Sequence, residues 1–213
     1  KGMTARGISQ EFCERVFEQI KGFSSYGFPE SHAASFALLA YVSCYLKRFY
    51  PAAFLAGLLN SQPLGFYSAS TLVRDAWNHG VEILPGDVNH SHWNSTLEGV
   101  CDGIPEDNDS KTWGHGGPKV RLGLRQIKGL RPDAVEVIET QRTIGSFTSV
   151  ENFCRRTKLD RSSLTKLAEA DAFASMGVNR RDALWQVKAW EEMPNQLIAR
   201  ADPEISNLGD AIR

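Results

Sequence analysis

The sequence predicts a mainly helical protein in which a short β-hairpin separates a larger helical part from a smaller one. Apolar residues recur at intervals of three and four over most of the chain, as in helices with one buried face. Ser, Asp or Asn precedes most of these segments, and Gly or Pro follows several of them, as at helix ends. Hydrophobic residues make up 42% of the 213 residues and charged residues 23%, which is typical of a globular protein.

Two helices are expected near the start of the chain. Residues 9–21 form the first, because Ser9 can cap it and apolar residues recur at helical spacing behind it. Residues 33–48 form the second, which is apolar on nearly every face. A helix of this kind is expected to be buried in the core.

Two further helices complete the first helical part. One begins at Pro51, which suits the first turn of a helix, and runs to Leu59. The next is capped by Ser68 and ends at Gly80. Its inward face is expected to hold four apolar side chains, namely Leu72, Val73, Ala76 and Trp77.

The middle of the chain predicts the β-hairpin. Residues 81–84 form a short apolar strand that ends at Pro85, and residues 119–124 form the returning strand. Residues 88–97 lead into an irregular stretch. Residues 102–118 are rich in Gly, Asp, Asn and Pro, which predicts a solvated loop or a wide hairpin connection.

Short helices follow the hairpin. Ser149, Asp160 and Asn179 stand at the cap positions of the last three of them. After residue 190 the apolar periodicity stops, which predicts a loosely ordered tail. The expected helices cover residues 132–142, 150–156, 161–170 and 180–190.

Charge is distributed unevenly along the chain. The formal net charge is −1, yet residues 119–190 hold 14 Lys and Arg against eight Asp and Glu, a net charge of +6. Residues 98–109 hold five acids and no base. The basic segment is therefore the expected nucleic-acid surface, and a solvated helical face with surplus Arg is the alternative.

The sequence offers no catalytic or metal-binding constellation of its own. Asp107 and Asp109 lie in the acidic loop and not at the end of an apolar strand. The five His and four Cys residues show no metal-ligand spacing, and the scattered Cys residues predict reduced thiols. No Gly-rich phosphate loop with a Lys follows a strand. We therefore expect no metal site and no catalytic residue in this chain.

The turn at residues 26–36 is the first candidate site. Gly27 and Pro29 predict a bend, Ser31 can cap the helix that follows, and His32 lies in its first turn. A helix N-terminus suits an anion, so this turn can bind phosphate. The alternative is that Ser31 is only a cap and His32 only covers the turn.

Residues 124–142 resemble a helix-hairpin-helix motif. In that motif, backbone N–H groups of a Gly-containing hairpin point at a phosphate. Lys128 and Gly129 match the first half of the hairpin, and Arg131 replaces its second Gly. A plain antiparallel helix pair is the alternative. The candidate DNA-binding residues are Arg125, Lys128, Gly129, Arg131, Arg155, Arg156, Arg180 and Arg181.

Residues 2–190 resemble the bacterial C-family DNA polymerases, in particular the error-prone branch. The resemblance rests on the turn Gly27-Phe-Pro-Glu-Ser-His32, on residues 59–68 and on several ungapped blocks in the family's order. It implies that Gly27, Phe28, Ser31 and His32 lie against the sugar of the incoming nucleotide. Pro29 and Glu30 stand where the family more usually has Asn and Lys, so no cation is expected there beside the triphosphate.

The resemblance also implies a domain organisation. Residues 1–98 would be part of a fingers subdomain, and residues 99–118 an acidic, Gly-rich loop. Residues 119–190 would form a helix-hairpin-helix-like DNA-binding module, followed by the tail, residues 191–213. The family's catalytic aspartates belong to its palm, which is not in this sequence, so the chain alone is expected to be inactive.

The activity implied by the resemblance is that of a DNA-directed DNA polymerase, a nucleotidyltransferase, in translesion synthesis. Its setting would be the bacterial cytoplasm, with Mg²⁺ held by the palm. Its partners would be primer–template DNA, deoxynucleoside triphosphates, the rest of the polymerase, and a sliding clamp and damage-response proteins. A non-enzymatic helix-hairpin-helix DNA-binding protein is the alternative, and a purely structural helical module is a second one.

Overall fold

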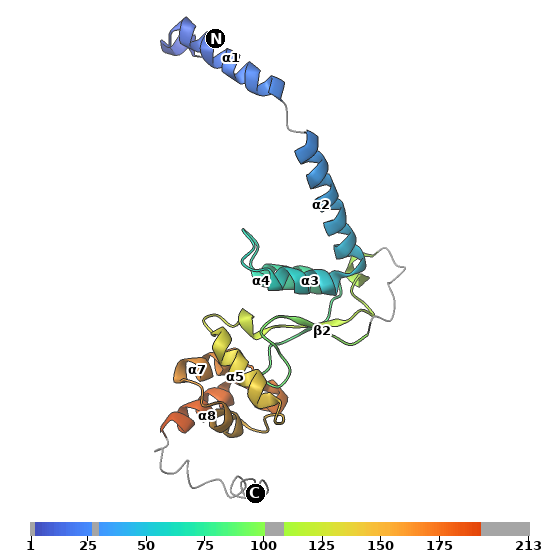
Figure 1. The fold of residues 1–213 in the computed structure, drawn as a ribbon, viewed down its shortest axis with the longest axis vertical. Coiled ribbons are helices and arrows are strands. Elements are labelled where there is room, and N and C mark those ends of the chain that lie inside the picture. The colour runs from blue at the N-terminus through green and yellow to red at the C-terminus, as the bar shows by residue number, and fades with distance from the viewer. Residues whose placement is uncertain (1–2, 27–29, 101–108, 193–213) are drawn as a thin grey trace, which may run out of the picture. The chain divides into compact units, whose positions relative to one another are not determined.

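The computed structural model describes residues 3–26, 30–100 and 109–192, and they form a mainly helical structure, as predicted (Figure 1). The chain divides into two compact units, Lys1–Leu46 and Lys47–Arg213. The predicted tail from residue 193 on and residues 101–108 of the predicted loop lie outside the described residues. No helix in the described ranges is long and apolar enough to cross a membrane.

The first unit contains a 3₁₀ turn, η1 (Thr4–Arg6), the helix α1 (Gln10–Tyr26) and most of the helix α2 (Glu30–Phe49). The Ser9 hydroxyl accepts the backbone N–H of Phe12 at 3.4 Å, which confirms Ser9 as the cap of α1. Helix α2 begins three residues earlier than predicted, so Ser31 lies inside the helix and does not occupy its cap position.

The predicted burial of α2 is wrong for the described part of the chain. Phe36, Leu38 and Tyr41 are 57%, 65% and 69% exposed, and α1 likewise exposes Phe17 and Ile20. An apolar composition shows that a helix favours burial, but it does not show which surface covers it. Within the first unit, the described residues leave these side chains uncovered.

In the second unit, the helices α3 (Pro51–Asn60) and α4 (Ala69–Asn78) pack on each other and on the sheet. Pro51 occupies the first turn of α3, and the Ser68 hydroxyl accepts the N–H of Thr71, as predicted. Ala76 is buried, but Trp77 is 69% exposed, which contradicts its predicted inward position. At 100° per residue, Trp77 lies at the edge of the apolar arc of α4, where the packing ends.

The sheet has three short strands, β1 (Ile83–Leu84), β2 (Thr96–Glu98) and β3 (Lys119–Arg121), in the order β1-β3-β2. Strand β3 pairs in parallel with β1 and antiparallel with β2. The predicted hairpin of the first and last strands is therefore wrong, because these strands pair in parallel, and β2, which was not predicted, is the antiparallel partner of β3. A strand of three residues has too little alternation to reveal its partner from the sequence.

The basic part of the chain folds around a second core. The Ser149 hydroxyl accepts the N–H of Asn152, and the Asn179 side chain accepts the N–H of Asp182, so both predicted caps are confirmed. Phe153 lies at the centre of this core. Its ring packs edge-on against Phe147 and Phe173, with centroids 4.8 and 5.1 Å away. The elements are η3 (Leu124–Gln126), α5 (Pro132–Arg142), α6 (Val150–Thr157), α7 (Arg161–Glu169), η4 (Ala174–Met176) and α8 (Arg180–Glu192).

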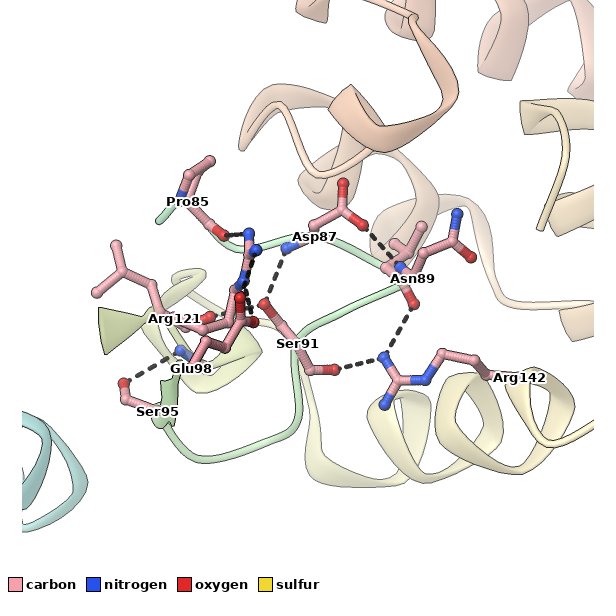
Figure 2. Close-up of polar contacts among 11 residues, drawn as sticks. Pro85, Asp87, Asn89, Ser91, Ser95, Glu98, Arg121 and Arg142 are labelled. Carbon is pink, nitrogen blue, oxygen red and sulfur yellow. Dashed lines mark hydrogen bonds and ion pairs between the residues drawn. The ribbon is translucent and has the colours of Figure 1, made fainter. Parts of the chain in front are cut away.

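The segment between β1 and β2 joins this core to the sheet through buried polar contacts (Figure 2). Asp87 is 2% exposed, and its carboxylate accepts the backbone N–H groups of Asn89 at 2.8 Å and Ser175 at 2.9 Å. Asn89 in turn bonds both backbone groups of Phe147 through its side-chain amide. Buried polar groups that are fully paired hold one arrangement of the chain.

Ser91 and Arg142 complete this junction, as Figure 2 shows. The Ser91 hydroxyl accepts the N–H of Asp87 at 2.9 Å and donates to the Leu122 carbonyl at 2.7 Å. Arg142, in the last turn of α5, donates to the Ser91 carbonyl at 2.8 Å. The sheet and the helices after it are therefore connected by hydrogen bonds as well as by the chain.

Candidate nucleic-acid interface

The hairpin before α5 is built around one glycine. Residues 127–130 turn back, and the N–H of Leu130 bonds to the Ile127 carbonyl at 3.1 Å. Gly129 has φ +78°, in the left-handed region that favours glycine. Arg131 has φ −94°, in extended backbone, so the second hairpin position needs no glycine here. Arg131, which stands where the motif has its second Gly, is therefore compatible with the hairpin.

Two lysines flank this hairpin. Lys128 is exposed beside Gly129, and Lys166, on α7, donates a hydrogen bond from Nζ to the Gly129 carbonyl at 2.8 Å. Both lysines line an open groove of about 410 Å³ between the hairpin, α7 and the end of β1. The groove's lining contains a single carboxylate among the described residues, that of Glu169. Its charge therefore suits an anion such as a phosphate.

An ion pair occupies the start of α5. The Arg131 guanidinium donates to both carboxylate oxygens of Asp133, and both side chains are exposed. This pairing holds the pKa of Asp133 below its usual range and raises that of Arg131. The carboxylate stands in the first helical turn, where an anion is favoured and where a DNA phosphate would compete with it.

The Arg125 side chain makes its hydrogen bonds to other residues of the protein. Its guanidinium donates to the backbone carbonyls of Asn60 at 2.7 Å and Gln62 at 3.1 Å, and to the Asn94 side chain at 2.9 Å. It also lies over the ring of Trp93, 6.0 Å from the centroid. This arginine holds the end of α3 against the segment before β2.

The arginines of α6 also have partners within the fold. Arg156 donates to the carbonyls of Gln141 and Gly145 and lies over the Phe147 ring, 4.5 Å from its centroid. Arg155 pairs with Glu151 at 2.8 Å. The remaining two predicted DNA-binding arginines, Arg180 and Arg181, are exposed in the first turn of α8.

The predicted nucleotide-binding turn is only partly described. Gly27 and Phe28 lie outside the described residues, as does the side chain of Ser31. His32 is exposed in the first turn of α2, and its ring packs edge-on against Phe36 at a centroid distance of 4.4 Å. The structure therefore places one of the four predicted side chains.

Lys166 is a residue of this interface that the sequence analysis did not select. It is 37 residues from Gly129 in the chain, and only the packing of α7 brings the two together. The positive charge of Lys166 contributes to the net charge of the basic segment, but charge alone does not distinguish it from the other basic residues there.

Among the described residues, no cluster of three or more His, Cys, Asp or Glu side chains could hold a metal ion.

The fold and the glycine hairpin define a small helical module, and the comparisons identify its class. Residues 80–183 match the helix-hairpin-helix motif. The chain is 53% identical over 188 residues to the error-prone DNA polymerase of Burkholderia mallei (strain ATCC 23344), covering 88% of this chain and 17% of that protein. It is 48% identical over 206 residues to the error-prone DNA polymerase of Rhodopirellula baltica, covering 96% of this chain and 17% of that protein.

A third relative, error-prone DNA polymerase 2 of Rhizobium meliloti (strain 1021), is 48% identical over 211 residues, which are 98% of this chain and 18% of that protein. With about half of its residues identical over most of its length, the chain belongs to the error-prone DNA polymerase family. It spans 17% to 18% of the length of these curated relatives.

Proposed function

We propose that this chain is a segment of an error-prone DNA-directed DNA polymerase that acts in translesion synthesis. Within the polymerase, this segment would face the incoming nucleotide and bind DNA through the sugar–phosphate backbone of the DNA. The observation that carries the proposal is the identity of 48% to 53% with named error-prone DNA polymerases over 88% to 98% of the chain. The hairpin at Gly129 supports the DNA-binding part.

The DNA-binding surface would centre on the groove beside the hairpin. Lys128 and Lys166 supply positive charge there, and Arg180 supplies further charge on α8, while Arg181 lines a separate groove. Contacts of this kind neutralise phosphates and carry no sequence information. Arg125, Arg155 and Arg156, which have partners inside the fold, would act by shaping this module rather than by touching DNA.

The nucleotide-facing part would be the turn before α2, with Gly27, Phe28, Ser31 and His32. This assignment rests on the resemblance of the turn to the family's nucleotide-binding turn. The exposed ring of His32 supports it, because a side chain that meets a ligand must be accessible. Glu30, in place of the more usual lysine, would leave the triphosphate without a cation at that position.

The exposed apolar faces of α1 and α2 would be covered by the rest of the polymerase. The high exposure of Phe17, Leu38 and Tyr41 supports this, because large apolar patches on an isolated surface mark interaction sites. The relatives are about six times longer than the segment that they share with this chain, so they have ample sequence to supply the partner surface.

The remaining parts of the proposal concern the whole polymerase. Mg²⁺ would be held by palm carboxylates, since the described residues of this chain do not fit a metal site. Primer–template DNA and deoxynucleoside triphosphates would be its substrates, and a sliding clamp and damage-response proteins its further partners. The cytoplasm would be its location.

The proposal is tested by DNA binding and by primer extension. In fluorescence anisotropy, the chain should bind two unrelated duplexes with equal affinity, and the affinity should fall steeply with salt. Lys128→Ala should lower the affinity for both and reduce the log–log salt slope by about 0.9, the value for one phosphate contact. A strong preference for one duplex, or an unchanged slope in the variant, would contradict backbone binding.

Primer extension then separates the polymerase from a non-enzymatic DNA-binding protein. The chain alone, with Mg²⁺ and all four deoxynucleoside triphosphates, should add no nucleotide. A full-length polymerase that carries this segment should extend the primer. If the full-length protein binds DNA and never extends a primer, the alternative function is correct.

A further inference from the structure

A second groove, of about 340 Å³, lies between α7 and α8. We propose that it binds single-stranded DNA, with a base stacked on Trp185 and the phosphates held by cations around it. Arg161 and Thr165 of α7 form one wall. The wall on α8 consists of Arg181, Leu184, Trp185, Val187 and Lys188.

The positive charge of this groove comes from both helices. Arg181 and Lys188 flank Trp185 on α8, at intervals of four and three residues, so the three side chains share one helix face. Arg161 faces them from the first turn of α7. None of the described residues that line the groove is acidic. Three cations around one aromatic ring favour a polyanion that also presents flat, apolar surfaces.

Two acids next to the groove in the sequence, Asp160 and Asp182, make hydrogen bonds with other residues. The Asp160 carboxylate accepts the Ser163 hydroxyl at 2.6 Å. The Asp182 carboxylate accepts the Asn179 side-chain amide at 2.8 Å, and its backbone N–H bonds to the same side chain. Both acids stay at helix starts and neither lines the groove, whose described lining holds three cations and no carboxylate.

Trp185 is the feature that selects single-stranded nucleic acid. Its side chain is 62% exposed, and Lys188 lies 5.8 Å from the ring centroid. An exposed indole stacks on any base whose face is free, and cations then hold the adjoining phosphates. In a duplex the bases are already stacked on each other, so their faces are closed to a side chain from outside.

The inference rests on the proposed function only in taking DNA as the ligand. The hairpin groove and the Trp185 groove are separate, but both use α7: Lys166 lies at the first and Arg161 at the second. The hairpin groove would bind the backbone of duplex DNA, and the Trp185 groove would bind an unpaired strand. The two sites therefore predict different responses to different oligonucleotides.

The test compares an oligothymidylate with a duplex of mixed sequence, using fluorescence anisotropy of the labelled DNA and the 213-residue chain. Trp185→Ala should weaken oligothymidylate binding about tenfold, as expected for the loss of one stacked base. Trp185→Phe should retain most of the affinity. Arg161→Ala should reduce the log–log salt slope for the single strand by about 0.7, the value for one phosphate.

Trp77→Ala is the matched control, because Trp77 is also a helical tryptophan with its side chain mostly exposed. It should leave oligothymidylate binding unchanged, and thermal denaturation should show that all variants fold. If Trp185→Ala binds the oligothymidylate as the unchanged chain does, or if Trp77→Ala weakens it equally, the inference is wrong.

The two ligands also separate this inference from the proposed function. Duplex binding that depends on Lys128, without binding of the oligothymidylate, overturns the single-strand site and leaves the proposed function intact. Oligothymidylate binding that depends on Trp185, without duplex binding, supports the site and contradicts the hairpin assignment. Binding of neither DNA overturns both.

Discussion

The ammonium group of Lys166 donates a 2.8 Å hydrogen bond to the carbonyl of Gly129, across 37 residues of sequence. The contact fixes the hairpin from the side of α7 and places a positive charge next to its turn. A Cβ atom at Gly129 would lie 3.3 Å from the Lys166 side chain. Hairpin conformation and local charge are therefore coupled through one pair of residues.

Gly129→Ala should weaken duplex binding and lower stability. The backbone at φ +78° costs an L-residue about 1–2 kcal/mol, and the new methyl group would displace Lys166. Gly116→Ala is the matched control, since Gly116 has φ +70° but open space around it. Urea denaturation should show similar losses of stability for both variants, while anisotropy should show weaker binding for Gly129→Ala alone. Equal affinities for the two variants would contradict the role of the hairpin.

Asp133→Asn should strengthen duplex binding. The substitution removes the carboxylate that pairs with Arg131 at the start of α5, so the guanidinium becomes available to a phosphate. One added contact should steepen the log–log salt slope by about 0.9. Glu136→Gln makes the same change of charge on an exposed position of α5 and is the control. If the two variants bind equally well, general charge and not the release of Arg131 explains the gain.

Asp87→Ala should destabilise the second unit by about 2–3 kcal/mol, because it leaves the buried N–H groups of Asn89 and Ser175 without their charged acceptor. Asp109→Ala, which removes an exposed cap from the N–H of Lys111, should cost about 1 kcal/mol or less. The free energy of unfolding in urea measures both. A loss at Asp87 no larger than that at Asp109 would show that the junction in Figure 2 is not a stabilising feature.

Glu98 should contribute to stability above pH 4.5 and lose that contribution in acid. Arg121 donates to both of its carboxylate oxygens, at 2.7 and 3.1 Å, and holds the pKa of Glu98 below its ordinary value of 4.5. A lowered folded-state pKa stabilises the fold above the unfolded-state value, and this stabilisation fades as pH falls through the folded-state value. Glu98→Gln should therefore reduce the loss of stability that occurs as pH falls below 4.5, measured by urea denaturation at a series of pH values. The same substitution at Glu151, in the exposed pair with Arg155, is the comparison, and equal acid dependence in both variants would contradict the assignment.

His32→Ala in a full-length polymerase that carries this segment should raise KM for deoxynucleoside triphosphates or change the discrimination against ribonucleotides. The reason is that His32 would touch the nucleotide sugar, while its exposed position means that the fold does not depend on it. Gln186→Ala, at an exposed polar position on α8 outside the predicted turn, is the control. Steady-state kinetics identical to those of the unchanged enzyme would reject the nucleotide assignment.

Most short-range features of this protein were predictable from sequence, although Ser31 does not cap α2. Helix α5 covers the predicted residues 132–142, and the caps at Ser9, Ser68, Ser149 and Asn179 all form. Each of these depends on a side chain and a backbone group three residues apart or fewer. Such contacts are set by local conformation, which is why a pattern in the sequence reveals them.

Long-range pairing was decided only by the tertiary structure. The partner of β3, the exposure of α2 and the contact of Lys166 with Gly129 all depend on segments that are distant in the chain. Arg125 and Lys128 illustrate the difference: they are three residues apart in one basic motif, yet Arg125 bonds the carbonyls of Asn60 and Gln62 while Lys128 faces the groove. The sequence determined that this segment is basic and turns at a glycine. Packing determined which charges remain available, because each guanidinium or ammonium group bonds to whichever carbonyl or carboxylate the fold brings within reach.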